Sequence, residues 1–334
     1  MKHLILTLAL FASPALADKL ADAQWVLSHQ DRYTAAQINW AKAYVAANAP
    51  TPAPTITTKA ISGQTALLNA LSGSKGGETF LLADGNYSIN LADRDYKGVT
   101  LKGGRGARIG SYAKLTRVSN LSFAGLTIRC SAAMPAGGYC FKLDGTKNIT
   151  FNYVAVAGVD GTGFAFYAAG AVNTGLKILK PDIGYTLYGV VMYGGADTLI
   201  EGGDFHHLGS DGISISGNRD TIVRSNIFRD AKPRPTQHPD VFQMVGTCTN
   251  TLFEYNDASG MWQGGGSYTK PQINVIYRRN RFAVGYSNVI YLAAGSTGAV
   301  LENSLKTVGQ YKPLIRLFDS GVKRIGNTLD GKPY

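Results

Sequence analysis

From about residue 61 to the C-terminus, short apolar segments alternate with turns rich in Gly, Asn and Asp. The turns return at intervals of 21 to 30 residues, marked by Gly77, Gly98, Asn120, Asn148, Asn173, Asp197, Asp220, Asn250, Asn274, Gly298 and Val322. The third residue after each marker is apolar in every repeat: Phe80, Leu101, Phe123, Phe151, Leu176, Ile200, Val223, Phe253, Tyr277, Leu301 and Ile325. An apolar position that returns once per repeat predicts an inward-facing column in a stack of coils.

A period near 24 residues, with several short strands and small turn residues per repeat, is typical of a parallel β-helix. Leucine-rich repeats share the period but carry a Leu-rich consensus and a helix per turn, and propeller blades need about 40 residues. We therefore predict an all-β fold, a parallel β-helix of about 10–11 coils over residues 61–334. Asn226, Asn256 and Asn280 stand six residues after their markers, which predicts a ladder of stacked amides.

The N-terminal region differs from the repeats. Residues 1–17 have the pattern of a secretory signal peptide, with Lys2, an apolar core and small residues before Asp18. Residues 18–60 contain a predicted helix that starts at the capping box 34–37 and a Pro-rich linker. We expect this helix to cover the open apolar end of the stack, because an exposed terminal coil would leave a sheet edge free to pair with other chains. The apolar runs in the remaining sequence are too short to predict a membrane span.

Composition narrows the choice of partner. The chain of 334 residues has 33 Lys+Arg against 22 Asp+Glu, a formal net charge of +11, and a basic surface attracts polyanions. It contains no run of five basic residues, and the expected export argues against nucleic acid. We expect a periplasmic or secreted protein, monomeric, whose partner is an acidic polysaccharide.

The three cysteines allow two interpretations. Cys130 and Cys140 enclose a loop rich in Ala, Gly and Pro, and an oxidising compartment would permit a disulfide between them. The alternative is that both are small buried side chains. Cys248 is predicted to be a packed thiol of the core.

The longest repeat interval contains an insertion, residues 229–243, and insertions on one side of a solenoid usually build its binding face. Three of the four histidines after the expected signal peptide lie in this insertion or in the coil before it, namely His206, His207 and His238. This concentration marks the region as the candidate active site.

Alignment of the two coils places Asp211 opposite Asp240. We expect the two carboxylates to face solvent and to repel each other, which would raise one pKa toward a useful acid or base. An alternative for Asp211 is a structural turn residue that caps backbone N–H groups. His238, oriented by Asp240, is the predicted general base, and Tyr268 is the predicted acid.

A second group of side chains is predicted to bind substrate. Gln243 could donate to a substrate carboxylate or hydroxyl, Trp262 could stack on a sugar ring, and basic side chains could pair with uronate carboxylates. Each is also compatible with an ordinary surface or packing role. The group consists of Gln243, Arg234, Lys232, Lys270, Trp262, His207 and Lys180.

The repeat over residues 61–330, with coil segments such as Asp211-Gly-Ile-Ser-Ile-Ser, resembles the pectin-lyase-like superfamily of right-handed parallel β-helices. The resemblance implies right-handed coiling and a secreted enzyme that acts on polysaccharide. Asp211-Gly212 and Asp240 are similar to carboxylate segments of polygalacturonases, with Pro239 in place of a further Asp. The Gly-His-Gly and Arg-Ile-Lys segments of that family have no match here.

These observations favour a polysaccharide lyase or epimerase on an acidic polysaccharide, most of all a lyase acting by β-elimination. A glycoside hydrolase that uses Asp211 and Asp240 is the catalytic alternative. A non-catalytic glycan-binding β-helix is the other. No cofactor is predicted, and Ca²⁺ stays open although the region has few carboxylates for a hard cation.

Overall fold

The computed structural model describes residues 57–334 except 132, 133, 135, 136, 160 and 287, together with three helical residues, Ile38, Asn39 and Lys42. The chain divides into two units, residues 1–55 and 56–334. The predicted signal peptide, the Pro-rich linker and most of the predicted N-terminal helix lie outside the described residues. Among the residues described, no helix is long and apolar enough to cross a membrane.

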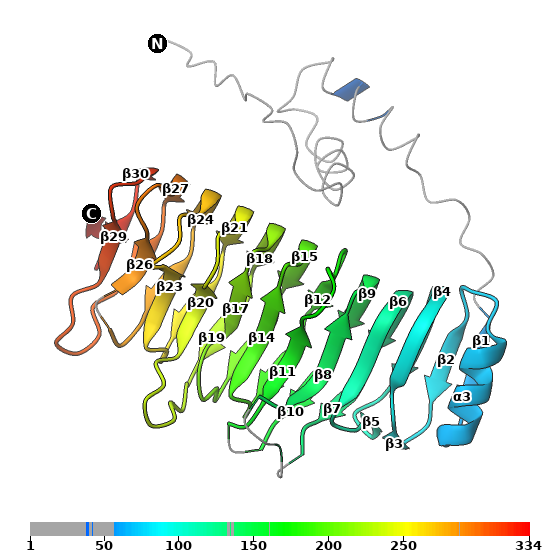
Figure 1. Ribbon diagram of the computed structural model, residues 1–334. Coiled ribbons are helices and arrows are strands. Elements are labelled where there is room, and N and C mark those ends of the chain that lie inside the picture. The colour runs from blue at the N-terminus through cyan, green and yellow to red at the C-terminus, as the bar shows by residue number, and fades with distance from the viewer. Residues whose placement is uncertain are drawn as a thin grey trace. The chain divides into compact units, whose positions relative to one another are not determined.

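The second unit is a solenoid of about eleven coils in which short strands form three faces (Figure 1). The first face contains β8 (Tyr139–Asp144), β11 (Phe164–Ala168), β14 (Tyr188–Tyr193), β17 (Ile213–Ser216), β20 (Asp240–Met244), β23 (Gln263–Ser267), β26 (Asn288–Leu292) and β29 (Leu314–Leu317). The second face contains β1 (Thr58–Ile61), β2 (Thr79–Leu82), β4 (Asn90–Gly103), β6 (Ala113–Ala124), β9 (Lys147–Asn152), β12 (Lys177–Leu179), β15 (Ala196–Glu201), β18 (Arg219–Arg224), β21 (Thr249–Glu254), β24 (Ile273–Arg278), β27 (Thr297–Leu301) and β30 (Gly321–Ile325). The third face contains β3 (Gly85–Tyr87), β5 (Ala107–Ile109), β7 (Thr127–Arg129), β10 (Ala155–Ala157), β13 (Asp182–Gly184), β16 (Asp204–His206), β19 (Ile227–Arg229), β22 (Asp257–Ser259), β25 (Arg281–Ala283), β28 (Ser304–Leu305), β31 (Thr328–Leu329) and β32 (Lys332–Pro333).

Strands on neighbouring coils pair in parallel, and the antiparallel pair β31–β32 closes the C-terminal end. The long strand β6 joins the first two faces into one 20-stranded sheet, because its first part pairs with β8 and its second part with β9. The third face is a separate 12-stranded sheet. This arrangement confirms the predicted parallel β-helix.

The predicted inward column is present in eight of the eleven repeats. Strand register aligns Phe80, Leu101, Phe123 and Phe151, and then Ile200, Val223, Phe253 and Tyr277. All eight side chains are buried in the apolar core. Stacked rings add to the packing, as where the centroids of Phe123 and Phe151 lie 5.0 Å apart.

Three of the predicted column positions are wrong. Ile178, rather than Leu176, continues the column, and in the last two coils the aligned residues are Val300 and Arg324. Ile325 is therefore 59% exposed and Leu301 is only half-buried. A shift of one residue has this effect because side chains alternate between the faces of a strand.

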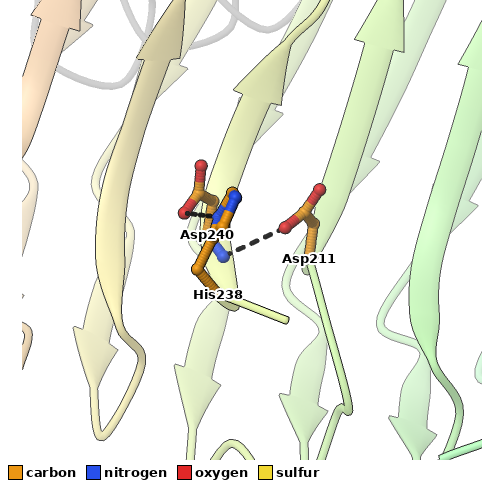
Figure 2. Close-up of side chains that lie close together, drawn as sticks. All are labelled: Asp211, His238 and Asp240. Atoms are coloured by element: carbon orange, nitrogen blue, oxygen red, sulfur yellow. Dashed lines mark hydrogen bonds and ion pairs between the residues drawn. The ribbon is translucent and has the colours of Figure 1, made fainter. Parts of the chain in front are cut away.

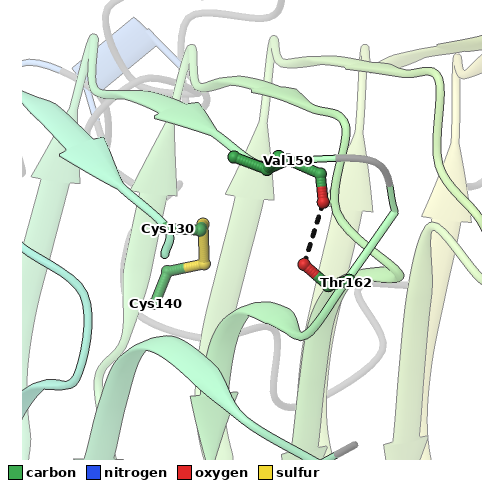
Figure 3. Close-up of a disulfide and its surroundings, with 4 residues drawn as sticks. All are labelled: Cys130, Cys140, Val159 and Thr162. Carbon is green, nitrogen blue, oxygen red and sulfur yellow. Dashed lines mark hydrogen bonds between the residues drawn. A yellow bond between two sulfur atoms is a disulfide. The ribbon is translucent and has the colours of Figure 1, made fainter. Parts of the chain in front are cut away.

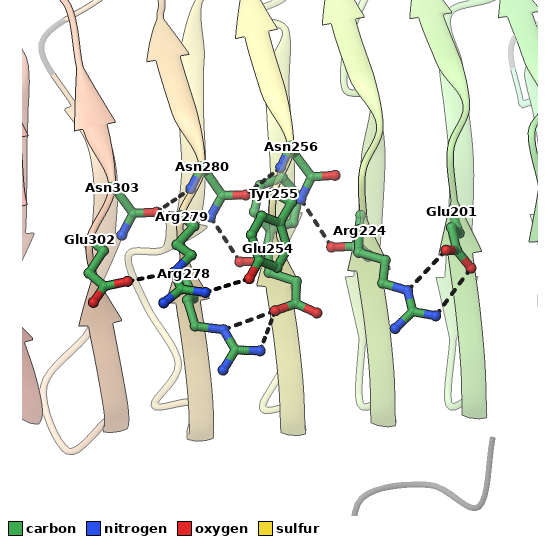
Figure 4. Close-up of polar contacts among 12 residues, drawn as sticks. Glu201, Arg224, Glu254, Tyr255, Asn256, Arg278, Arg279, Asn280, Glu302 and Asn303 are labelled. Carbon is green, nitrogen blue, oxygen red and sulfur yellow. Dashed lines mark hydrogen bonds and ion pairs between the residues drawn. The ribbon is translucent and has the colours of Figure 1, made fainter. Parts of the chain in front are cut away.

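A buried asparagine ladder follows the second face (Figure 4). From the second member on, each Oδ1 accepts the backbone N–H and the side-chain N–H of the asparagine one coil before it, at 2.9–3.0 Å. The structure extends the three predicted members to five: Asn226, Asn256, Asn280, Asn303 and Asn327. Ion pairs such as Arg224–Glu201, in which both side chains are half-buried, lie on the same face.

One helix of the second unit was not predicted. The helix α3 (Gln64–Gly73) lies beside β1 and β2 at the N-terminal end of the solenoid (Figure 1). Its residues Leu67, Ala70 and Leu71 are buried in the core. It therefore covers the first coil. The sequence analysis expected a different helix, before residue 61, to do this.

A disulfide joins Cys130 and Cys140, which decides between the two interpretations of these residues (Figure 3). It closes the loop between β7 and β8, next to a turn in which Thr162 Oγ1 donates to the Val159 carbonyl at 2.9 Å. Cys248 is buried, and burial raises the pKa of its thiol. It is a core residue, as predicted.

The ladder predicts a stability effect of Asn280→Ala. The substitution removes the acceptor for two N–H groups of Asn256 that are buried away from water. We expect the free energy of unfolding to fall by about 2 kcal/mol or more. Urea denaturation measures this loss, and Asn86→Ala, at an exposed position of β3, is the matched control. Equal effects of the two substitutions would contradict a stabilising role for the ladder.

Candidate functional site

The site forms where two neighbouring coils enter the first face. The register of β17 with β20 aligns Ile213 with Phe242, so that Asp211 lies beside Asp240 (Figure 2). The backbone N–H of Gly212 donates to the Asp240 carbonyl at 2.8 Å. This agrees with the alignment of the two coils made from the sequence.

The insertion between β19 and β20 is held against the coil before it. The backbone N–H of Lys232 donates to the Leu208 carbonyl at 2.8 Å, and that of Arg234 donates to the Gly209 carbonyl at 3.1 Å. These bonds fix the path of the chain that leads to His238.

His238, Asp240 and Asp211 form a compact cluster. The Nδ1 atom of His238 lies 3.3 Å from Asp240 Oδ1, and Asp211 Oδ1 accepts the backbone N–H of Asp240 at 3.1 Å. One ligand-type atom from each side chain falls within 4.8 Å of the others. The histidine side chain is 53% exposed.

The two carboxyl groups do not face solvent, contrary to the expectation from sequence. Asp240 is fully buried and Asp211 is 3% exposed. The imidazole of His238, which contacts Asp240, is the exposed member of the cluster.

The sequence interpretation missed Tyr291, which holds the other oxygen of Asp240. Its Oη donates to Asp240 Oδ2 at 2.6 Å, although β23 separates β26 from β20. In the register, Gly266 stands between Gln243 and Tyr291, so no side chain on β23 obstructs the tyrosine ring. The three consecutive glycines 264–266 were the available signal for such a crossing.

Burial controls the titration of the cluster. It raises the pKa of Asp211 well above the usual carboxyl value, and the charge of nearby Asp240 raises it further. Burial also raises the pKa of Asp240, while hydrogen bonds from Tyr291 and His238 oppose the shift. Two carboxyl groups this close cannot both ionise easily, so the pair retains a proton at a higher pH than an exposed Asp would.

Tyr268 is the second hydroxyl beside the cluster. Its ring stacks on Tyr291 with 3.8 Å between centroids, and its hydroxyl contacts Asn288 Nδ2 and Gln263 Oε1. Burial raises the Tyr268 pKa, and the positive charge of Arg316 acts in the opposite direction. Arg316 lies in register with Tyr291 and is exposed, and it was not among the predicted site residues.

Gln243 and Trp262 also lie at the site. Gln243 Nε2 is 3.4 Å from Asp240 Oδ2, and the residue is half-buried. Trp262 is exposed, and its backbone N–H donates to the Pro239 carbonyl at 2.9 Å. With Pro233, Pro239 and Tyr311, it lines an apolar cavity of about 260 Å³ next to the strand that carries Asp240.

Three other predicted binding residues, His207, Lys232 and Lys180, contact tyrosine side chains. His207 stacks on Tyr185 with 4.7 Å between ring centroids, and Lys232 Nζ lies 5.6 Å above the same Tyr185 ring. Lys180 Nζ donates to Tyr153 Oη at 2.7 Å, after β12.

Arg234 lies in the insertion, and Lys270 follows β23. The Arg234 side chain lies close to Gly161 and Gly209. Lys270 is exposed, two residues after Tyr268. Tyr291 and Gln243 both form side-chain hydrogen bonds with Asp240.

The donor set of the cluster fits proton handling better than Ca²⁺ binding. Ca²⁺ takes about six to eight oxygen ligands, whereas Asp211, His238 and Asp240 offer two carboxyl groups and one ring nitrogen. Hydrogen-bond donors already point at these carboxyl oxygens, among them the Tyr291 hydroxyl.

Comparisons with known proteins identify the fold. Residues 170–328 match the family model described as a right-handed beta helix region. The Dettilon tailspike protein is 15% identical, over 80% of this chain and 57% of its own, with a TM-score of 0.53. The adhesin PfbA of Streptococcus pneumoniae is 10% identical, over 80% of this chain and 94% of its own, with a TM-score of 0.49. The periplasmic alginate epimerase AlgG is 11% identical, over 80% of this chain and 84% of its own, with a TM-score of 0.47. No curated protein sequence matches the chain. The solenoid is a right-handed β-helix.

The raised pKa of Asp211 predicts that Asp211→Asn stabilises the protein. The amide oxygen can still accept the Asp240 N–H, but the second buried acid is removed. Below the ordinary carboxyl pKa of about 3.9 the acid is protonated in both the folded and the unfolded chain. As pH rises above that value, the unfolded chain ionises first and wild-type stability falls, so the advantage of the variant grows with pH.

Thermal melting from pH 4 to 8 measures this effect, and we expect a gain of about 2 °C or more near neutral pH. The control is Asp204→Asn, which removes a more exposed carboxylate paired with Arg229 at 2.8 Å and should give no such gain. A variant of Asp211 that melts lower than wild type at every pH would contradict the prediction.

Proposed function

We propose that this protein is an exported lyase that cleaves an acidic, uronate-containing polysaccharide by β-elimination, with His238 as the general base. The observation that supports this proposal most is the His238–Asp240 pair, in which the carboxyl group is fully buried and the imidazole is exposed. The expected signal peptide and the net charge of +11 support export and an anionic substrate.

The pair is arranged for proton abstraction. When Nδ1–H donates to Asp240, the Nε2 atom carries the free lone pair and is the atom available to a substrate. Tyr291 and Gln243 contact the other oxygen of Asp240, and this fixes the carboxylate that orients the ring. A base that is oriented in this way typically contributes about 10²- to 10⁴-fold to the rate.

The remaining steps of the elimination can be assigned to neighbouring groups. His238 takes the proton from C5 of the uronate, the C4–O bond breaks, and a C4=C5 double bond forms. Tyr268 gives its proton to the departing oxygen. Gln243 and Arg316 are the groups that would neutralise the substrate carboxylate, and this makes the C5 proton more acidic.

A hydrolase that uses Asp211 and Asp240 is the second candidate, supported by the closeness of the two carboxyl groups. Hydrolases place their carboxyl groups about 5–5.5 Å apart for retention and about 6.5–9.5 Å apart for inversion, with both able to reach the sugar. Here both are buried and His238 is the exposed group, which favours the lyase.

The products distinguish these functions. The protein would be incubated with a panel of acidic and neutral polysaccharides, followed by near-ultraviolet absorbance and by an assay for reducing ends. A lyase produces an unsaturated sugar that absorbs, whereas a hydrolase produces only new reducing ends. Binding without either product would leave a glycan-binding protein.

His238→Ala and Asp240→Asn should each lower turnover by about 10²-fold or more, because the base is lost or misoriented. The His238 variant should keep the wild-type melting temperature, since this side chain is exposed. The chain offers a matched control in His206→Ala, because His206 Nε2 also contacts an aspartate, Asp182, at 3.0 Å on the third face. Near-normal turnover in the His238 variant would remove this residue from the mechanism and favour the hydrolase.

A further inference from the structure

A continuous group of aromatic rings occupies the first face on the N-terminal side of Asp211. The rings come from four successive coils, and neighbouring centroids are 5.0 to 6.4 Å apart. We name this group the aromatic belt, and its members are Tyr112, Tyr139, Phe164, Tyr167, Tyr188 and Tyr193.

The belt lies on the outside of the solenoid and is not part of the core. Tyr112 and Tyr193 are 44% and 45% exposed, and the other four rings are half-buried. The inward positions of the same strands hold other side chains, such as Phe166 and Val190, which are fully buried. Core packing therefore does not account for the belt, and exposed apolar surface of this extent often marks a binding site.

The belt is continuous with the candidate active site. Phe164 is in register with Tyr188, and the Gly189 N–H next to Tyr188 donates to the Asp211 carbonyl at 3.0 Å. Asp211 in turn lies beside Asp240. Equivalent positions on four successive coils thus lead from aromatic rings to the carboxyl pair, at the coil spacing of about 4.8 Å, which is close to the length of one sugar unit.

Basic side chains accompany the rings. Lys142 Nζ lies 5.9 Å from the Tyr139 centroid and 5.7 Å from the Tyr167 centroid. Lys114 is in register with Lys142 on the coil before it. Asp144, farther along β8, accepts a backbone N–H. Rings that stack on sugar faces, next to ammonium groups that pair with carboxylates, fit a chain of uronate sugars.

We propose that the aromatic belt binds the part of an acidic polysaccharide that extends beyond the reacting unit, with the sugar chain along the solenoid axis. This proposal rests on the proposed function of the Asp211–Asp240 region. The belt holds about three sugar units, one per coil from Tyr188 back to Tyr139. Long chains therefore use it, and chains that fill only the reacting subsites do not.

The test uses the double variant Tyr139→Ala/Tyr167→Ala and the single variant Lys142→Ala. The matched control is Tyr255→Ala, which removes another exposed tyrosine with a guanidinium over its ring, that of Arg279 at 5.7 Å. Circular dichroism and melting establish that each variant is folded. Ligands are oligouronates of about three and about eight units, one shorter and one longer than the combined sites. They come from the polysaccharide that the wild type cleaves, or from polygalacturonate if it cleaves none.

Binding is measured by calorimetry in the Asp240→Asn background, in which we expect turnover to be lower by about 10²-fold or more. We expect the double variant to bind the longer oligosaccharide at least tenfold more weakly and the shorter one as before. Lys142→Ala should also weaken binding of the longer oligosaccharide, and its loss of affinity should be smaller at high salt. In the active protein, KM for the long substrate should rise while kcat stays. Unchanged affinity for the long ligand, an equal loss for both lengths, or the same loss in the control would overturn the proposal.

The outcome is separable from the proposed function. If no polysaccharide is cleaved but the belt variants still lose affinity in a length-dependent manner, the belt stands and the lyase fails. If the wild type cleaves a polyuronate and the belt variants match it at every length, the lyase stands and the belt fails.

Discussion

Parallel hydrogen bonding between coils is the constraint on which the rest of this structure depends. It holds equivalent residues of successive coils about 4.8 Å apart, so that a position on one coil becomes a neighbour of the same position on the next. Inward positions become the apolar column, and the position of Asn280 becomes a ladder of amides. The same rule brings Asp211 beside Asp240, although 29 residues separate them in sequence.

Because it buries two acids side by side, this stacking lowers the stability of the fold, and contacts around the carboxyl pair limit that loss. A hydroxyl from Tyr291, a backbone N–H and the imidazole of His238 contact the two buried acids. Replacing one buried acid with a neutral isostere would relieve repulsion, so stability alone does not explain the pair. Groups that destabilise a fold and are nevertheless held in place are typical of functional sites.

The sequence predicted the fold because the fold is repetitive. The eleven repeat markers predicted the number of coils and most of the apolar column. They failed at Leu176, which stands two residues before the column position Ile178. They also failed at Leu301 and Ile325, where the chosen markers, Gly298 and Val322, were one residue late. Asn303 and Asn327 carried the correct register. The helix α3 was missed because Leu67, Ala70 and Leu71 form a short pattern within a region of strand-like segments.

The site was less predictable because its contacts cross coils. The pairing of Asp211 with Asp240 follows from alignment of adjacent repeats, but their burial depends on how the insertion folds back. Tyr291 lies 51 residues from Asp240 and reaches it only because Gly266 leaves the path free. Such a contact requires the register of three coils and a small middle residue. The sequence shows the glycine, but only strand pairing shows the register. On this face a side chain is therefore best interpreted by its row along the solenoid. The row of Asp240 changes from aromatic rings to acids at Asp211, where the proposed binding surface meets the candidate active site.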